Sequence, residues 1–555
     1  MPDSAFSIDK LAFFEGVLYE LAIIKMNYIN GESQERTIAT GLACGFDALE
    51  QGNFKLVIDI AKQILSTNRN IPQAHYLIGR VTLETRQLDI ALRAFETAAE
   101  LDASMSEYWA FLALVYAQTG NMIDAETAVM RAQKIGSEKA QVLAPIAHVL
   151  SLLGYFDDAT KYLRMAVQKS PTEATYCHAL GVSLLELGDF KGAQEAIEKA
   201  IVLNPYNAES RWILSSLFKA TDNVMAEQLV SIMDESKGLP SSIAYLGYGA
   251  GKLFEDTECW DKAFDAFLRG AAAKRSIVNY DRFQAKQTFE AIKTICTENW
   301  LRTAHNDHNE VAPIFIIGQP RTGTTLVDRI ISSHSLVHSA GEPVQLAMSL
   351  RALTGVRTEE FISAELINKS KDVSGELLAE SYLTGLANRR GSTPYFIDKF
   401  PMNFMLVGFI VKAFPKAKIV HVTRSPADTC FAVFKQLFEE VYQHSYDQCE
   451  MAEHYVMYKN LMEYWHAIMP DKIFDIAYED IVTDNYTQAR NLIKYLGLEW
   501  EDNCSNFEKN NTAVVTASAV QVRETAHNRS IGRWKNYEKQ LSPTLTILSA
   551  AGISP

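Results

Sequence analysis

The feature that most constrains the fold is a motif that returns every 34 residues in the first half of the chain. The segments GNMIDA, GYFDDA and GDFKGA begin at Gly120, Gly154 and Gly188. A variant, RQLDIA, begins at Arg86, and GNFKLV at Gly52 extends the series one interval earlier. A fixed interval of this length indicates stacked helical units, because one unit cannot bury its apolar face alone.

Small residues follow the same interval. Ala91, Ala125, Ala159 and Ala193 share one phase, and Pro171 and Pro205 end two of the units. The segment WAFLALVY, from Trp109, supplies large apolar positions ahead of the small ones. This pattern is similar to tetratricopeptide repeats, in which small residues lie where two antiparallel helices approach closely. Five units are in phase, and looser ones are expected near Ala226 and Ala263.

Such an array offers a concave groove for a protein or peptide partner. The alternative is that the repeats only form a homodimer or brace the domain behind them. The formal net charge of −14 argues against a general nucleic-acid binder or a binder of anionic membranes, since both need a basic surface. We therefore expect a protein or peptide partner and no nucleic acid.

The first 35 residues are expected to form an amphipathic helix. Its most apolar stretch carries Glu15, Glu20 and Lys25, so no membrane span is predicted. The seven cysteines are scattered, without a C-x-x-C pair, which is typical of reduced thiols. Together these features predict a cytoplasmic chain.

The sequence pattern changes after about residue 275, where a helical connector follows the repeats. From Val311 onward, short apolar runs alternate with helix-length segments, which predicts an α/β domain with a central parallel sheet. The expected organisation is an N-terminal helix at 1–35, an α-solenoid of tetratricopeptide repeats at 36–272, a connector at 273–310 and an α/β phosphate-loop domain at 311–555.

Five candidate strands each end in a polar residue or a glycine loop. PIFIIG ends at the glycine loop, LVHSAGEP at Glu342, PYFIDKFP at Asp398 and Lys399, KIVHVTRSP at Arg424, and KIFDIAYED at Tyr478 and Glu479. In open parallel sheets, ligands bind outside the carboxyl ends of the strands. We therefore expect these residues to form one site.

The glycine loop favours an anionic ligand. Gly318 and Gly323 are five residues apart, as in phosphate loops, but Thr324 stands where that pattern has lysine. The lysine serves to hold the β- and γ-phosphates of a triphosphate, so its replacement argues against ATP.

A second candidate site for an anion follows Arg424. Ser425 and Pro426 are typical of a helix start directly after this arginine, and helix starts favour phosphate. Two candidate anion sites, together with the absence of the phosphate-loop lysine, favour a nucleotide whose phosphates are on separate positions.

Residues 311–540 resemble the sulfotransferases, most closely the tyrosylprotein sulfotransferases and their relatives with an N-terminal tetratricopeptide array. The resemblance rests on PRTGTT, GEP, DKFP, TRSPAD, YED and TASAVQVRETAHNRSIGRW. It implies transfer of a sulfonyl group from 3′-phosphoadenosine 5′-phosphosulfate (PAPS) to an acceptor hydroxyl, with no metal required. Protein or peptide tyrosine is the natural acceptor, recruited by the repeat array.

The resemblance also implies a role for each matching residue. Glu342 would be the catalytic base, while Lys399 and Ser518 would stabilise the transition state. The 5′-phosphosulfate would be held by Arg321, Thr322, Gly323, Thr324 and Thr325, the 3′-phosphate by Arg424, Ser518 and Arg533, and Tyr478 would contact the cofactor.

The sequence departs from the family near Arg424. Ala432 stands where the family has a serine that donates to the 3′-phosphate, and Gln436 replaces a basic residue. Lys435, one turn further along the predicted helix, is expected to supply the missing donor. Because every motif lies beyond Val311, the fragment starting there is expected to retain cofactor binding.

Two other functions stay open at the level of sequence. One is a phosphate-loop kinase or ATPase, which would need ATP and magnesium. The other is a tetratricopeptide scaffold with a degenerate cofactor-binding domain. Single residues also have structural alternatives, such as a salt bridge between Lys399 and Asp398. His334 and His338 lack a third ligand, so no zinc site is predicted.

Overall fold

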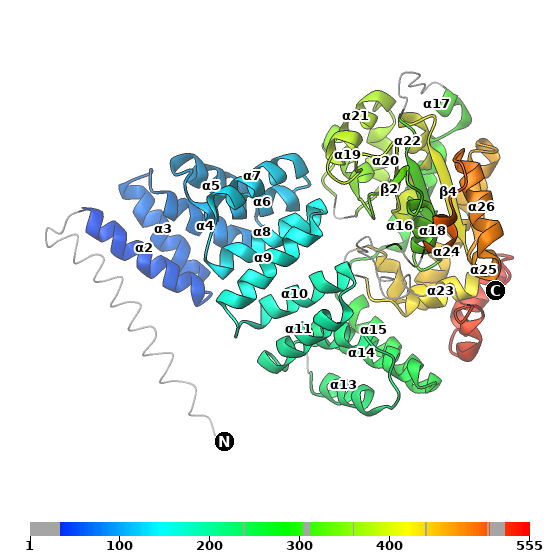
Figure 1. Cartoon of the computed structure of the whole chain (residues 1–555), viewed down its shortest axis with the longest axis horizontal. Coiled ribbons are helices and arrows are strands. Elements are labelled where there is room, and N and C mark those ends of the chain that lie inside the picture. The colour runs from blue at the N-terminus through cyan, green and yellow to red at the C-terminus, as the bar shows by residue number, and fades with distance from the viewer. Residues whose placement is uncertain are drawn as a thin grey trace. The chain divides into compact units, whose positions relative to one another are not determined.

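The computed structural model describes residues 34–236, 239–302, 311–358, 360–438, 441–507, 510 and 528–555. The chain divides into two compact units, Met1–Lys169 and Ser170–Pro555 (Figure 1). The boundaries expected from sequence pattern remain predictions, and the helix expected at 1–35 lies almost wholly outside the described residues. In the described part of the chain, no helix combines the length and apolar character needed to cross a bilayer.

The first unit consists of helices that pack in successive pairs. They are α2 (Gln34–Glu50), α3 (Phe54–Thr67), α4 (Pro72–Glu84), α5 (Leu88–Leu101), α6 (Ser106–Gln118), α7 (Met122–Ile135), α8 (Ala140–Leu153) and α9 (Phe156–Lys169). The phase predicted for the small residues is confirmed, because Ala91, Ala125 and Ala159 are completely buried between paired helices.

The turn inside each pair explains the 34-residue interval. Gly52 and Gly120 adopt φ of +71° and +81°, which glycine reaches without steric cost. The residue after each one, Asn53 or Asn121, caps the next helix by accepting a backbone N–H with its side chain. Arg86 occupies the same place in its repeat with φ of +58°, a conformation uncommon for arginine.

The second unit begins with further helices. They are α10 (Ala174–Leu187), α11 (Phe190–Leu203), α12 (Ala208–Ser216), α13 (Val224–Glu235), α14 (Pro240–Asp256), α15 (Trp260–Arg275), α16 (Arg282–Ile295) and α17 (Glu298–Arg302). Ala193, Ala226 and Ala263 are fully buried, so the looser repeats keep the small-residue position.

A parallel sheet with strand order β2-β3-β1-β4-β5 follows, as the sequence predicts. The strands are β1 (Ile314–Gly318), β2 (Val337–Ser339), β3 (Tyr395–Asp398), β4 (Lys418–Thr423) and β5 (Ile473–Ala477). The chain places β2 and β3 on one side of β1 and then β4 and β5 on the other. The strand order therefore reverses at β1, which is where open α/β sheets bind ligands.

Helices cover both faces of the sheet (Figure 1). They are α18 (Thr324–Ser332), α19 (Gln345–Thr354), α20 (Ala364–Ser370), α21 (Gly375–Gly385), α22 (Val407–Ala413), α23 (Pro426–Phe434), α24 (Gln448–Ile468), α25 (Tyr478–Thr483), α26 (Asn485–Leu496) and α27 (Ser542–Ala550). Short 3-10 helices are η1 (Pro401–Leu406), η2 (Gln443–Tyr446), η3 (Asp502–Ser505) and η6 (Arg533–Tyr537).

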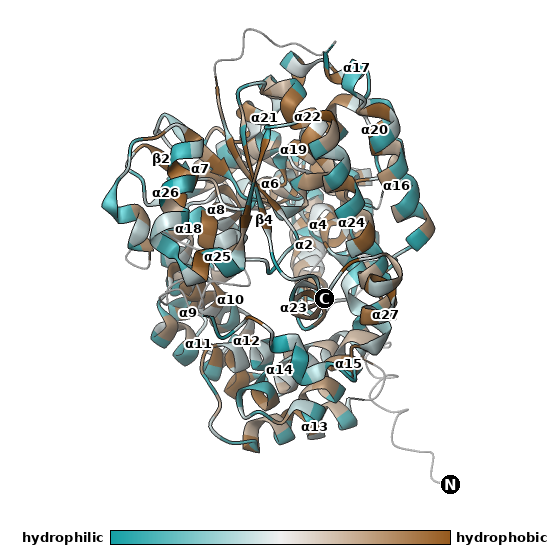
Figure 2. Cartoon of the chain, turned by 90° about the vertical axis from the view of Figure 1, so that its right-hand side faces the viewer, coloured by the Kyte–Doolittle hydropathy of each residue, from teal (hydrophilic) through white to brown (hydrophobic). Residues whose placement is uncertain are grey.

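The two faces of β1 contribute to different cores, and Figure 2 shows the apolar strands between their covering helices. Ile314 and Ile316 pack with α18 and α26. Phe315 and Ile317 belong to a larger core that continues without a break into residues of α12 to α15. The last helices of the repeat region therefore share the core of the sheet domain.

Candidate functional site

The loop between β1 and α18 carries the first group of predicted site residues. It occupies 319–323, directly after Gly318 at the end of β1, and α18 begins at Thr324, as predicted. The Thr322 hydroxyl donates to the Gln319 carbonyl at 2.8 Å and also approaches the Val422 carbonyl of β4 at 3.3 Å. The loop is thereby fixed to the neighbouring strand, with the amino end of a nine-residue helix behind it, an arrangement that favours anions.

Gly323 is required by a close approach as well as by its φ of +97°. A Cβ atom at this position would lie 2.7 Å from Cδ2 of Tyr478. The Tyr478 ring, at the start of α25, therefore packs on the loop backbone. The Arg424 guanidinium lies over the same ring, 5.0 Å from its centroid. The predicted cofactor residue Tyr478 thus lies between the glycine loop and Arg424.

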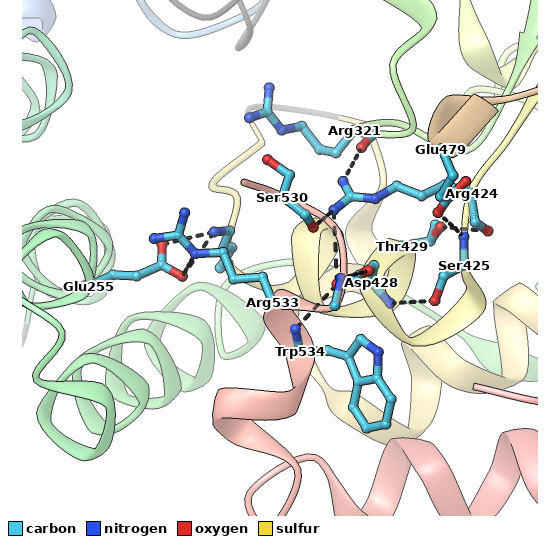
Figure 3. Close-up of polar contacts among 12 residues, drawn as sticks. Glu255, Arg321, Arg424, Ser425, Asp428, Thr429, Glu479, Ser530, Arg533 and Trp534 are labelled. Carbon is cyan, nitrogen blue, oxygen red and sulfur yellow. Dashed lines mark hydrogen bonds and ion pairs between the residues drawn. The ribbon is translucent and has the colours of Figure 1, made fainter. Parts of the chain in front are cut away.

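Arg424 connects these loops directly. Its Nη1 donates to the Arg321 carbonyl at 3.0 Å and its Nη2 to the Ser530 carbonyl at 2.5 Å (Figure 3). Arg321 has φ of +66°, which is uncommon for arginine. Burial, followed by the neighbouring charge of Arg424, lowers the pKa of Arg321 to about 10. The Arg321 guanidinium therefore carries its charge at neutral pH, close to the guanidinium of Arg424.

The loop after β4, which carries Arg424, has the predicted helix start. The Ser425 side chain accepts from the Asp428 amide, and Pro426 is the first residue of α23. The Ser425 amide itself donates to a Glu479 carboxylate oxygen at 2.9 Å. This last contact ties the end of β4 to the end of β5, so both strands hold one site.

Glu342 and Lys399, the predicted base and transition-state cation, form an ion pair. Lys399 is therefore not paired with Asp398, the structural alternative raised by the sequence. The Asp398 carboxylate instead accepts from the Tyr382 hydroxyl at 2.7 Å and from Asn403 Nδ2 at 2.9 Å. Burial raises the pKa of Asp398 to about 7, against these hydrogen bonds.

Asp328, on α18, is a further carboxylate that the sequence did not single out. Burial raises its pKa, while the charge of Lys399 and a hydrogen bond from Ser339 oppose that rise. Its Oδ1 is buried and has no hydrogen-bond partner in the described part of the chain. In the sequence it looks like one polar position on an amphipathic helix, so only the packing reveals it.

Arg533, the predicted basic residue of the closing segment, begins η6. The amides on either side of it, from Gly532 and Trp534, donate to the Asp428 carboxylate at 2.6 and 3.2 Å (Figure 3). The Arg533 Nε donates to Glu255 Oε1 at 2.9 Å. Ser518 lies outside the described residues, so its role stays a prediction.

The end of α23 differs from the sequence expectation. The helix ends at Phe434, so Lys435 is its C-cap and Gln436 lies beyond it. The Lys435 ammonium donates to both carboxylate oxygens of Glu255, at 3.0 and 2.8 Å. Its expected role as a donor to a phosphate therefore competes with an ion pair that local sequence could not reveal. Ala432 lies buried on the helix before it.

A group that could hold a metal lies elsewhere on the sheet. Ligand atoms of His421, His466 and Asp475 lie within 4.8 Å of one another. Asp475 bridges the two histidines, at 2.6 and 3.2 Å, and the Tyr458 hydroxyl lies 2.5 Å from the second ring nitrogen of His421. These contacts already satisfy the buried histidine, so we interpret the group as a hydrogen-bonded network.

Comparison with known proteins agrees with this architecture. Residues 313–502 match a model described as the sulfotransferase family, and residues 59–212 match the C-terminal domain of cilia and flagella-associated protein 70, a tetratricopeptide-type model. An uncharacterized protein of Aquifex aeolicus is 29% identical over 403 residues, which cover 70% of this chain and 52% of that protein.

More distant relatives carry functional names. A protein-tyrosine sulfotransferase of Drosophila melanogaster is 22% identical over 264 residues, covering 45% of this chain and 53% of that protein. Protein-tyrosine sulfotransferase 1 of Danio rerio is 21% identical over 281 residues, covering 47% and 78%. The matched regions span about half the length of the Aquifex and Drosophila relatives. The chain therefore carries a sulfotransferase-family domain behind a tetratricopeptide-like array.

Proposed function

We propose that the chain transfers a sulfonyl group from PAPS to an acceptor hydroxyl. One observation carries this proposal: two cationic loops, joined by the contact between Arg321 and Arg424, lie with the Glu342–Lys399 pair at the carboxyl edge of one sheet. Electrostatic influence also links the two groups, because the charge of Glu342 acts on the pKa of Arg321.

The residues present fit such a ligand. The Arg424 Nε is buried and has no hydrogen-bond partner among the described residues. The like charges of Arg321 and Arg424 disfavour each other, and a bound anion would stabilise both. We expect Arg321 and the amides up to Thr325 to hold the 5′-phosphosulfate. Arg424, Arg533 and Ser518 would hold the 3′-phosphate, with Tyr478 against the cofactor.

In the transfer step, the acceptor oxygen forms a bond to sulfur while the bond between sulfur and the 5′-phosphate oxygen breaks. Glu342 takes the proton of the acceptor hydroxyl, as a general base. The Lys399 ammonium stabilises the negative charge that develops on the leaving phosphate oxygen. Because Lys399 is nearly fully buried, its charge acts in a region with little water and is screened weakly.

The acceptor proposal rests on the resemblance and on the array. Protein or peptide tyrosine is the proposed acceptor, with the repeat groove recruiting the acceptor or a partner. We further propose a cytoplasmic location, which the separated free cysteines favour. The proposed transfer step requires no metal ion.

Calorimetry tests the proposal without knowledge of the acceptor. We expect adenosine 3′,5′-bisphosphate to bind in the absence of magnesium and ATP to bind weakly or not at all. Binding of ATP that depends on magnesium would instead support a kinase or ATPase. Binding of neither nucleotide would support a degenerate scaffold.

A further inference from the structure

A carboxylate from the repeat region reaches the cationic site. Glu255, in the last turn of α14, accepts from Lys435 at 3.0 and 2.8 Å and from Arg533 at 2.9 Å (Figure 3). Its partners follow 180 and 278 residues later in the chain. Glu255 therefore joins α14 to both the end of α23 and the start of η6.

This arrangement is an ion triad centred on a buried carboxylate. The Glu255 side chain is only 6% exposed, and a buried carboxylate without partners would be costly. Burial acts to raise the pKa of Glu255, but the charges of Lys435 and Arg533 outweigh it and lower that pKa. The Lys435 ammonium donates to both carboxylate oxygens and so neutralises Glu255. The Arg533 side chain is the more exposed of the two cations, at 29%.

The contacts of Arg533 leave its Nη1 and Nη2 atoms available to a ligand. Its backbone is fixed by Asp428, which accepts from the amides on both sides, and its Nε is fixed by Glu255. In the described part of the chain, no hydrogen bond is made by its Nη1 or Nη2. A guanidinium anchored through Nε presents two parallel donors, the arrangement that suits a phosphate.

The triad belongs to the same positively charged group as the anion-binding loops. The charge of Arg321 lowers the pKa of Lys435, in addition to the effect of burial, and Arg321 itself is influenced by Arg424. We propose that Glu255 is a positioning residue, by which α14 orients Arg533 toward the second phosphate of the nucleotide. This inference rests on the proposed function.

The sign of the mutational effect separates this role from its opposite. A carboxylate near an anion site also repels the anion, so Glu255→Gln would tighten binding if repulsion dominated. If positioning dominates, Glu255→Gln weakens binding by about tenfold, the effect expected when one long side chain must be ordered anew. The full-length variant should be titrated with adenosine 3′,5′-bisphosphate and with adenosine 5′-monophosphate, which lacks the second phosphate.

We expect the loss for the bisphosphate only, with unchanged affinity for the monophosphate. Asp256→Asn is the matched control, because Asp256 is the next residue of α14 and contacts Lys252 at 2.7 Å and the Ala220 amide at 2.9 Å, instead of Arg533. It should change neither affinity. In an Arg533→Ala background, Glu255→Gln should have no further effect, because its action passes through Arg533.

Glu255→Gln leaves a buried ammonium, so a folding defect must be separated from a binding effect. The double variant Glu255→Gln/Lys435→Met removes both charges, and buried pairs often tolerate neutral replacement. The same selective loss is expected from it. Tighter bisphosphate binding, an equal loss for both nucleotides or no change in either variant would overturn the inference. Failure of the unmodified chain to bind the bisphosphate would instead contradict the proposed function.

Discussion

The carboxylate of Glu342 and the ammonium of Lys399 are paired at the carboxyl edge of the sheet. Lys399 is 1% exposed and Glu342 33%, so the cation is enclosed while the carboxylate opens toward solvent. The Lys399 amide also donates to the Gly341 carbonyl at 2.9 Å, which fixes the two residues at backbone level. The proposed base and the proposed electrostatic catalyst are therefore oriented as one unit.

Glu342→Gln is expected to lower the rate of transfer by about 10²–10⁴, the usual contribution of a general base. The side chains are nearly the same size, and removing the negative charge of Glu342 near Arg321 does not disfavour an anion, so bisphosphate binding should be retained. Turnover and calorimetry on the same preparation measure both. Glu365→Gln is the control, because Glu365 is an exposed carboxylate paired with Lys369 at 2.8 Å. A loss below tenfold with chemistry rate-limiting would assign the base elsewhere, with Asp328 the next carboxylate to test.

Ala432→Ser is expected to tighten adenosine 3′,5′-bisphosphate. A hydroxyl on this face of α23 adds a donor near the second phosphate, and a hydrogen bond to a charged group is worth about 1.5–3 kcal/mol. We expect the dissociation constant to fall by roughly tenfold or more. Cys430→Ser adds a hydroxyl on a packed part of the same helix and should not improve binding. Unchanged affinity in Ala432→Ser would place this face away from the phosphate.

Asp398 is expected to make stability depend on pH. Its pKa is about 7 in the folded chain, above the ordinary value of 3.8, because burial disfavours the charged form. The folded state then binds more protons than the unfolded state between these values, so stability falls as pH rises from about 4 to about 7. The full difference is at most about 4 kcal/mol. Thermal unfolding of the chain and of Asp398→Asn at pH 5 and pH 8 measures it.

If Asp398 is not the titrating group, the stability of the unmodified chain and of Asp398→Asn should change with pH in the same way. We expect the unmodified chain to lose stability relative to Asp398→Asn on going from pH 5 to pH 8. Tyr382→Phe, which removes one donor to the same carboxylate, should raise the midpoint of this transition further.

A fragment that begins at Ser170 is expected to fold and bind the bisphosphate, whereas one that begins at Val311 is not. The shorter fragment lacks Glu255 and uncovers the core that α12 to α15 share with the sheet domain. The structure thereby changes the expectation from sequence that residues beyond Val311 suffice. Solubility, circular dichroism and nucleotide binding compare the two. A soluble Val311 fragment with the affinity of the full chain would show that α14 is dispensable.

Features with a local signature could be predicted from the sequence. The buried alanines follow from a constant interval, and the site at the carboxyl edge follows from strands that each end in a polar residue. Neighbouring residues likewise indicate the start of α18 at Thr324 and the helix cap at Ser425. These features depend on backbone periodicity and on short-range hydrogen bonds, which a single sequence displays.

Features that depend on distant packing could not be predicted. Nothing near Glu255 marks it as a partner of Lys435, since only the tertiary fold brings α14 to α23. Lys435 has the same limitation, because α23 ends at Phe434 and the Lys435 side chain pairs with Glu255 of α14. Arg86 shows a third case, because the repeat position that elsewhere holds glycine tolerates a left-handed arginine here.

The core shared by α15 and the sheet domain also affects folding while the chain is being synthesised. The ring of Phe264 packs against Phe434 and Tyr537, with centroid separations of 5.7 and 5.9 Å. Tyr537 leaves the ribosome 273 residues after Phe264, roughly 14–55 s later at ordinary rates of translation. Until then Phe264 lacks one of its two ring partners, and until Phe434 is synthesised it lacks both. We therefore expect nascent chains to expose part of the apolar face of α15 until the C-terminal segment has been synthesised.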